Sequence, residues 1–377
     1  MTTLTLDKLG PIRHAELPLG DLTVLVGPQA SGKSLALQAL KAAVDMDAIV
    51  EVLKLHGFHF DDGAEALNEL VFGEGMGTLV GPDTRIALDG SPVELKALAD
   101  AAWSKGSRRS PRAFVIPAQR VLTLQEGWPR PFVAWSVEAP FVVRQFSEDL
   151  RRLMEDSKGP VFPAPRLTKE LRARISDTIF HGASVGVDRS RARKRVVLEV
   201  RDQEALPFMS WSAGQREFIP LMLGLYHLMP SAGSSRRQQL EYAILEEPEM
   251  GLHPAAIRAV ALALMELIRR GYKVIVATHS PHLLELVWAL NLLQGSSRFE
   301  ASLAELLGVG KLTSGLAEAV NKATLRVIAM KHGQEGVVSK DISTLDPDDP
   351  DPDVAGWGGL TDFADIAASV VARGVEE

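Results

Sequence analysis

The sequence contains a glycine-rich segment whose residue types could hold the phosphates of a nucleotide. This segment fits the pattern G-x-x-x-x-G-K-S. In such a loop, backbone N–H groups close around the phosphates, the lysine reaches the β- and γ-phosphates, and the serine hydroxyl binds Mg²⁺. The positions predicted to bind nucleotide are Gly27, Pro28, Gln29, Ala30, Ser31, Gly32, Lys33 and Ser34, with Ser34 also a predicted metal ligand.

The residues on either side of this loop support the same interpretation. Residues 22–26 form a compact β-prone run, and residues 34–52 carry apolar side chains at helical spacing. A strand that enters the loop and a helix that leaves it are the context that the motif requires. A chance match in a glycine-rich turn is therefore the weaker interpretation.

Two carboxylates follow a second β-prone run. Glu246 and Glu247 come directly after residues 242–245. In open α/β sheets, ligands bind beyond the carboxyl ends of parallel strands. One carboxylate can enter the coordination shell of Mg²⁺, and the next can orient or deprotonate water. A solvated acidic strand end is the alternative, and the phosphate loop makes it the weaker one. We predict Glu246 as a metal ligand and Glu247 as catalytic.

A histidine ends the next β-prone run. His279 follows residues 274–277 and lies 32 residues after Glu247, with one expected helix between them. This spacing places His279 on a neighbouring strand, where it can donate to the γ-phosphate region. A lone histidine is more often a capping or core residue, but the other motifs favour function. We therefore predict His279 and Lys33 as catalytic alongside Glu247.

A serine and a glycine precede another expected helix. Trp211-Ser212-Ala213-Gly214-Gln215 places Ser212 where a helix N-cap would stand. A helix N-terminus beside a glycine is also a ready anion site. The cap and the phosphate contact are compatible.

The four motifs in this order resemble the ABC-type ATPase head, especially the soluble branch with SMC, RecF and OLD-type proteins. The resemblance implies an α/β P-loop NTPase with a mixed or parallel central sheet and an inserted, largely helical lid. It also implies that the phosphate loop of one copy faces the signature of another. ATP and Mg²⁺ would then be enclosed by a head-to-tail dimer or a higher homo-oligomer.

The resemblance assigns a role to each matching residue. Glu246 would be the metal-assisting acid, Glu247 the catalytic base and His279 the switch histidine. Gln119, which follows a β-prone run at 114–117, matches the Q-loop glutamine that would contact nucleotide and metal. The signature residues that would contact ATP in trans are Ser212, Gly214 and Gln215.

Two of these motifs differ from the pattern of membrane transporters. Ala213 replaces the first usual glycine of the signature, and Glu246 replaces an aspartate. Glu-Glu-Pro-Glu followed by Gly-Leu-His-Pro looks like OLD-type and related bacterial ATPases, many of which serve in phage-defence operons. The resemblance thus implies an ATP-hydrolysing switch that controls a separately encoded effector in antiviral defence or a toxin–antitoxin pair. A RecF-like DNA-repair ATPase and a non-enzymatic, nucleotide-gated scaffold remain alternatives.

Composition excludes several classes of protein. The chain of 377 residues has no cysteine, so disulfides and cysteine metal sites are excluded. No apolar run is long enough to span a membrane, and we expect a cytoplasmic protein. The net charge of -7 argues against attraction of the whole surface to nucleic acid, although local patches can still bind it.

The chain divides into four expected parts. Residues 1–120 form a nucleotide-binding lobe, 121–185 a separate helical lid, 186–330 the rest of the ATPase core, and 331–377 an exposed acidic linker with a final helix. Asp351-Pro352-Asp353 resembles the acidic pair of the TOPRIM nuclease in OLD-type proteins. Because no buried β-run precedes it and little chain follows, we expect no nuclease domain here.

A cluster of basic residues has two interpretations. It could contact a phosphate backbone, or it could be a solvated hairpin turn. The hairpin is favoured, because charge runs usually face water. The residues concerned are Arg189, Arg191, Arg193, Lys194 and Arg195, with Arg108, Arg109 and Arg112 elsewhere in the chain.

Overall fold

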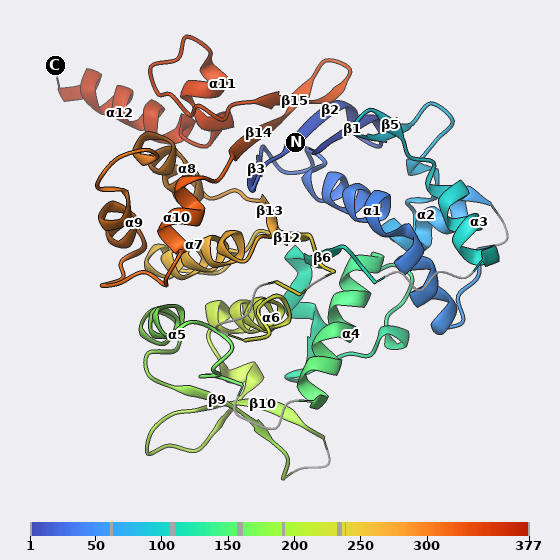
Figure 1. Cartoon of the computed structure of the whole chain (residues 1–377), viewed down its shortest axis with the longest axis horizontal. Helices are drawn as coiled ribbons and strands as arrows, with labels where there is room; N and C mark the ends of the chain where they lie inside the picture. The colour runs from blue at the N-terminus through green and yellow to red at the C-terminus, as the bar shows by residue number, and fades with distance from the viewer. Residues whose placement is uncertain are drawn as a thin grey trace.

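Strands of continuous apolar residues form the centre of a ten-stranded sheet (Figure 1). The computed structural model describes residues 2–60, 63–105, 110–156, 161–190, 193–231, 236–237 and 239–375. Helices cover both faces of the central strands, which is why most residues of these strands are apolar instead of alternating with polar ones. They run parallel, in the order β14 (Leu325–Gly333), β3 (Leu22–Val26), β13 (Lys273–Ala277), β12 (Tyr242–Glu246) and β6 (Ala113–Ile116).

The other half of the sheet is mainly antiparallel. The tight hairpin β1–β2 pairs with β4 on one side and with β15 on the other. The hairpin β14–β15 joins the halves, because β14 pairs with β3 and β15 pairs with β2. The strands of this half are β1 (Thr2–Leu9), β2 (Ile12–Leu19), β4 (Arg85–Leu88), β5 (Ser91–Pro92) and β15 (Gly336–Asp341).

Each central strand buries alternate side chains against a different layer of helices. Ile244 and Ile275 face one layer, which contains α1 (Lys33–Leu55), α2 (Ala64–Phe72) and α3 (Leu95–Lys105). Leu245 and Val276 face the other layer, with α6 (Ala213–Leu228), α7 (Pro254–Arg269) and α8 (Pro281–Leu293). The helices α9 (Phe299–Leu307) and α10 (Leu316–Asn321) extend this second layer. The predicted α/β class with a mixed central sheet is confirmed.

The segment expected as a separate lid shares the core of the sheet. Its helix α4 (Phe141–Asp156) packs against α6 and β6, and α5 (Lys169–Ile175) packs against α7. Apolar side chains such as Phe146 and Leu171 are buried in the same cluster as those of α6 and α7. The segment therefore packs into the core of the body, and its bounds as an inserted lid, residues 121–185, stay a prediction. The short strands here are β7 (Leu124–Gln125), β8 (Trp128–Pro129), β9 (Ser184–Asp188), β10 (Arg195–Glu199) and β11 (Leu206–Pro207).

The chain after residue 331 is not the exposed linker that the sequence suggested. The expected boundary falls inside β14, and β15 is an internal strand of the sheet. The acidic run is held against this hairpin, because Lys340 Nζ lies 2.8 Å from Asp353 Oδ2 and Lys331 also contacts that carboxylate. Asp351 caps the short helix α11 (Pro352–Ala355), and the buried Trp357 donates to the Leu345 carbonyl.

The last helix, α12 (Asp362–Val375), stands away from the rest of the molecule in Figure 1. Its residues 362–373 are all exposed, and Phe363 keeps 85% of its surface accessible. We expect deletion of residues 362–377 to change the free energy of unfolding by less than about 0.5 kcal/mol, because no core contact is lost. Thermal unfolding of the truncated and full chains measures this. A drop of several degrees in Tm would show that α12 packs on the body in solution.

Among the described residues, none of the helices combines the length and the apolar character needed to cross a bilayer.

Candidate active site

The phosphate loop lies between the end of β3 and the start of α1. Lys33 Nζ lies 2.8 Å from the carbonyl oxygens of both Gly27 and Pro28, and 3.3 Å from Ser31 Oγ. Burial lowers the pKa of Lys33, and the carboxylate of Glu247 opposes this shift. The lysine is thus held inside the loop, at a helix N-terminus whose free N–H groups favour an anion.

Close packing against β14 explains why the first residue of the phosphate loop, Gly27, is a glycine. Gly27 has φ of +141°, and a Cβ there would lie 2.2 Å from the Met330 carbonyl oxygen of β14. The loop therefore depends on close contact with a strand more than 290 residues later in the chain.

We expect Gly27→Ala to weaken nucleotide binding by about tenfold or more, because the added methyl group must push the loop away from β14. Gly310→Ala is the matched control, since a Cβ at Gly310 meets nothing within 4 Å. Titration with a fluorescent ATP analogue measures both variants. Equal affinities for the two would show that the close approach is unimportant.

Glu246 is buried at the carboxyl end of β12, with 2% of its surface accessible. Its Oε2 accepts a hydrogen bond of 3.3 Å from the Ala118 N–H, whereas Oε1 is buried and has no partner among the described residues. Burial raises the pKa of Glu246 to about 7, against the opposing effects of Ala118 and Ser34. An unpartnered carboxylate oxygen beside a serine hydroxyl fits Mg²⁺, which takes one or two protein oxygens together with phosphates and water.

Glu247 and His279 face each other across neighbouring strands. The distance from His279 Nε2 to Glu247 Oε1 is 3.8 Å. Glu247 adopts φ of +43°, and its N–H donates to the Ala277 carbonyl of β13 at 2.8 Å. Burial lowers the pKa of His279, and the nearby Lys33 adds to this shift. The imidazole is therefore neutral near pH 7 and can either donate or accept a hydrogen bond.

Four predicted residues therefore lie around the carboxyl ends of β3, β12 and β13. They are Lys33, Glu246, Glu247 and His279. Two carboxylates, an ammonium group and an imidazole beside a phosphate-binding loop can together hold a nucleotide, a divalent cation and a water molecule.

Arg120 is a structural partner of this site that the sequence reasoning missed. Its fully buried guanidinium donates to three carbonyl oxygens, those of Glu246 at 3.0 Å, Glu247 at 3.1 Å and Glu217 at 3.1 Å. It therefore ties the acidic pair to α6. An arginine next to an apolar strand was the available signal, but no sequence pattern shows which carbonyl groups it reaches.

Glu249 was also missed. Its Oε1 accepts hydrogen bonds from the Thr278 hydroxyl and from the His279 N–H at 3.2 Å. Its Oε2 is buried without a partner among the described residues. Glu249 thus positions the histidine from the loop that follows the acidic pair, and its place in Glu-Glu-Pro-Glu was the only signal.

The signature residues 212–215 form the expected start of helix α6, but their side chains do not hydrogen-bond to the phosphate loop among the described residues. Ser212 Oγ accepts from the Gln215 N–H at 3.3 Å, and Gln215 Oε1 accepts from the Ser212 N–H, which is a capping box. Gln215 Nε2 donates to Ile179, and a Cβ on Gly214 would lie 2.7 Å from the Gly251 carbonyl. In the described part of the chain, no hydrogen bond joins residues 212–215 to residues 27–34.

Gln119 is exposed immediately after β6. Its neighbour Ala118, not Gln119 itself, contacts the Glu246 carboxylate. A contact between Gln119 and the metal or nucleotide stays a prediction.

Comparisons with known proteins find a relative in sequence and solved structures that are similar to this chain. The Old nuclease of Escherichia phage P2 is 28% identical over 134 residues, which are 35% of this chain and only 20% of that protein. Two solved structures are also similar. One is an SmcHead bound to the C-winged helix domain of ScpA, with 11% identity, coverage of 90% and 96% of the two chains and a TM-score of 0.43. The other is the SMC head domain from Thermotoga maritima, with 12% identity, coverage of 90% and 97% and a TM-score of 0.38.

A family model spans most of the chain. Residues 22–285 match the model described as AAA domain, putative AbiEii toxin, Type IV TA system. The matched range includes the phosphate loop, the signature, the acidic pair and His279. The chain therefore belongs to this family of AAA domains.

Proposed function

We propose that this protein binds ATP with Mg²⁺ and hydrolyses it between two copies of the chain arranged head to tail. The main support is the gathering of Lys33, Glu246, Glu247 and His279 beside the phosphate loop, with one oxygen of Glu246 buried and without a partner among the described residues. This arrangement has the parts that phosphoryl transfer to water requires, which are positioning groups and charge stabilisation.

Each side chain then has a chemical role. Lys33 binds the β- and γ-phosphates and stabilises the charge that develops on the transferred group. Glu247 accepts a proton from the attacking water, and His279 hydrogen-bonds the γ-phosphate region. Ser34 and Glu246 hold Mg²⁺, which neutralises phosphate charge when bound. Glu249 and Arg120 position the histidine and the acidic pair.

The signature supports a site shared between chains. Ser212 is exposed, and among the described residues the side chains of Ser212 and Gln215 bond only to each other's backbone N–H groups and to the Ile179 carbonyl. The free N–H groups at the start of α6 can therefore reach a phosphate that a second chain supplies.

A mixing experiment tests the shared site. Ser212→Asp keeps a good N-cap but sets a carboxylate against the phosphate, and Lys33→Ala removes the phosphate-loop cation. Each variant alone is expected to be nearly inactive. A one-to-one mixture should recover about a quarter of the wild-type activity, because half of the dimers are mixed and each has one intact composite site.

Two outcomes oppose the proposal. The first is a mixture that recovers no activity although both variants are folded and the Ser212→Asp chain still binds nucleotide. This result would place the whole site within one chain. Full activity of Ser212→Asp would remove Ser212 from the site. Ser314→Asp, a substitution at another exposed serine next to a helix start, controls for the added charge.

We further propose that closure of the two chains is a switch that controls a separate partner protein in the cytoplasm. The family description, which names a putative toxin of a toxin–antitoxin system, supports this role over a stand-alone enzyme. Affinity purification in the presence of ATP with Glu247→Gln, followed by mass spectrometry, should enrich one protein that is absent without ATP. Equal enrichment of the partner protein with and without ATP would contradict the proposed switch.

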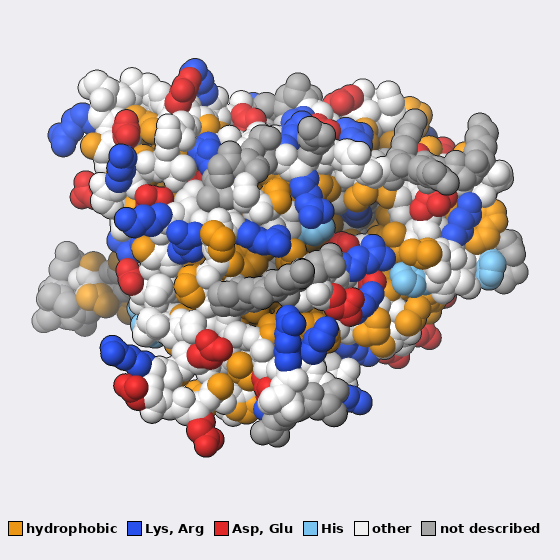
Figure 2. All heavy atoms as spheres, turned by 60° about the horizontal axis from the view of Figure 1, so that its bottom comes forward, with side chains coloured by type: hydrophobic (Ala, Val, Ile, Leu, Met, Phe, Trp, Pro, Cys, Tyr) orange, Lys and Arg blue, Asp and Glu red, His pale blue; other side chains and the backbone are white. Residues whose placement is uncertain are grey.

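A second function, binding of a nucleic-acid backbone, is favoured by one specific surface. Figure 2 shows Lys and Arg side chains gathered across the middle of the face that it presents. Arg193, Lys194 and Arg130 line a cavity of about 360 Å³, and Lys194 lies over the Trp128 ring at 5.7 Å. Arg195 also lines this cavity but pairs with Asp188 in the β9–β10 hairpin, and Arg112 pairs with Glu241. Arg108, Arg109 and Arg191 lie outside the described residues.

Hydrolysis rates separate the two functions. For a DNA-dependent ATPase, duplex DNA should raise the rate severalfold at low salt, and Lys194→Gln should remove the increase. An unchanged rate with DNA supports the protein switch. Lys311→Gln, at an exposed lysine elsewhere, is the control.

A further inference from the structure

A large cavity lies at the outer edge of the sheet, away from the phosphate loop. It has a volume of about 770 Å³, within the range of pockets that hold small molecules. Its walls come from α1, α4, the outer strand β6 and the end of α6. None of the proposed ATP-binding residues lines it.

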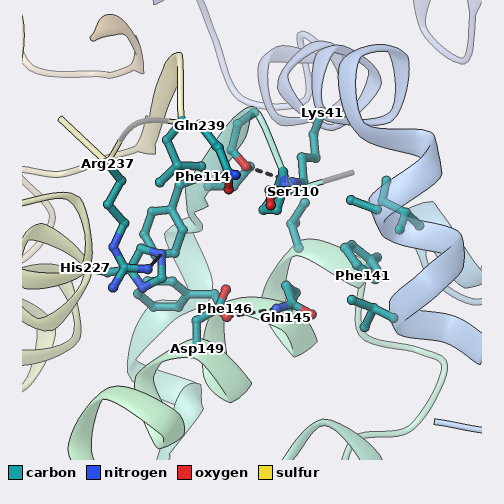
Figure 3. A pocket seen from close by; sticks show the side chains of 18 of the residues that line it. Lys41, Ser110, Phe114, Phe141, Gln145, Phe146, Asp149, His227, Arg237 and Gln239 are labelled. Atoms are coloured by element: carbon teal, nitrogen blue, oxygen red, sulfur yellow. Dashed lines mark hydrogen bonds between the residues drawn. The ribbon is translucent and has the colours of Figure 1, made fainter. Parts of the chain in front are cut away.

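Aromatic side chains form the walls of this cavity. Figure 3 shows Phe114 and His227 on one side and Phe141 on the other, with Phe146 nearby. The rings of Phe114 and His227 stack with centroids 4.3 Å apart, and Phe146 is tilted against Phe114 at 5.9 Å. Such walls favour a flat, aromatic ligand.

One end of the cavity offers hydrogen-bond acceptors. Gln145 Nε2 donates to Asp149 Oδ1 at 2.9 Å, which leaves Gln145 Oε1 buried without a partner among the described residues. Burial raises the pKa of Asp149 to about 6, although the Gln145 hydrogen bond and the nearby cations Lys41 and Arg152 oppose this shift, so its carboxylate is poorly solvated. A buried acceptor without a donor costs free energy, and a ligand with neighbouring N–H groups would supply the donors.

Another side of the cavity offers a positive charge. The Arg237 guanidinium lies 3.5 Å from His227 Nε2, and no carboxylate in the described part of the chain pairs with it. Burial lowers the pKa of His227 to about 3, so the imidazole is neutral and does not repel an anion. The other two cations are already neutralised, Lys41 by Asp45 at 2.6 Å and Arg152 by Glu148 at 3.1 Å.

We propose that this cavity binds a planar nitrogen heterocycle that is rich in N–H donors and carries an anionic group, the chemistry of a guanine nucleoside monophosphate. The ring lies between the aromatic walls, its N–H edge meets Gln145 and Asp149, and the anion meets Arg237. A guanidinium can bind a phosphate through two hydrogen bonds. The site is separate from the proposed ATPase and does not depend on hydrolysis.

Calorimetric titration of the full chain with GMP tests the proposal. The Lys33→Ala background is used so that the phosphate loop contributes little binding. GMP is expected to bind with one site per chain, and guanosine to bind at least about tenfold more weakly because it lacks the anion. Ribose 5-phosphate, which lacks the base, should not bind measurably.

Variants then assign the binding to this cavity. Arg237→Gln should weaken GMP binding by about tenfold or more and leave guanosine binding unchanged. Arg236→Gln is the matched control, because the Arg236 side chain points to the Gly271 carbonyl instead. Ala48→Trp should fill the cavity from α1 and abolish binding of both ligands, with circular dichroism confirming that the chain is folded.

The proposal is overturned if GMP does not bind the folded Lys33→Ala chain. It is equally overturned if GMP binds but Ala48→Trp and Arg237→Gln leave its affinity unchanged, since the ligand then lies elsewhere. Failure of ATP hydrolysis has no bearing on either result, so this site and the proposed ATPase fail separately.

Discussion

Glu247→Gln is expected to lower the rate of ATP hydrolysis by about 10²–10⁴-fold and to leave ATP binding intact. The amide cannot accept the proton of the attacking water, but it keeps the size of the side chain. The left-handed backbone at Glu247 and its N–H bond to Ala277 do not involve the carboxylate, so the fold should be preserved. Phosphate release measures the rate, and titration with ATP measures affinity.

The same variant should also accumulate as a closed dimer, because ATP remains at the interface when it is not hydrolysed. Light scattering with and without Mg-ATP detects this. Glu285→Gln, at an exposed position of α8, is the control for loss of a carboxylate. A Glu247→Gln rate within threefold of the wild type would show that another group is the base.

Arg120→Met is expected to lower the free energy of unfolding by about 3 kcal/mol or more and to reduce hydrolysis at the same time. Three carbonyl oxygens would lose their buried donor, and the carboxylates of Glu246, Glu247, Glu249 and Glu217 would lose a nearby cation. Burial lowers the pKa of Arg120, while these carboxylates oppose the shift. The acidic pair would then be both less stable and less well placed.

Chemical denaturation measures the stability change, and phosphate release measures the activity. Arg258→Met, at an exposed arginine of α7, should change neither. Arg120→Lys keeps the positive charge but cannot donate to all three carbonyl oxygens in the same geometry. We therefore expect this variant to be more stable than Arg120→Met but to regain little of its hydrolysis rate. An Arg120→Met chain as stable as the wild type would show that water replaces the guanidinium.

Much of the fold could be predicted because its signals are local. Leu22–Val26 and Lys273–Ala277 are apolar except for Thr23 and Lys273, and helices 33–55 and 281–293 follow them at short distances along the chain. The β-prone run Arg195–Glu199 also forms a strand, which pairs with β9 and β11. In each case the pattern of neighbouring residues is enough to define the element.

The errors concern elements whose surroundings lie far away in the sequence. The sequence predicts a linker from residue 331 because an acidic run follows it, whereas residues 325–341 form the hairpin β14–β15. Lys331 and Lys340, which both belong to the hairpin, pair with the last two aspartates of that run, Asp351 and Asp353. Helix α4 has the composition of a surface helix, but it is buried by α6 and β6.

The sequence by itself determined the chemistry that this protein can offer, because the phosphate loop, the acidic pair and His279 are recognised by residue type and spacing along one chain. Only the tertiary structure decided how these groups are held. Met330 packs on Gly27, Arg120 binds the carbonyls of the acidic pair, and Glu249 positions His279. The cavity beside β6 likewise exists only where α1, α4 and α6 meet. Such contacts depend on the packing of distant segments, which local sequence patterns do not encode.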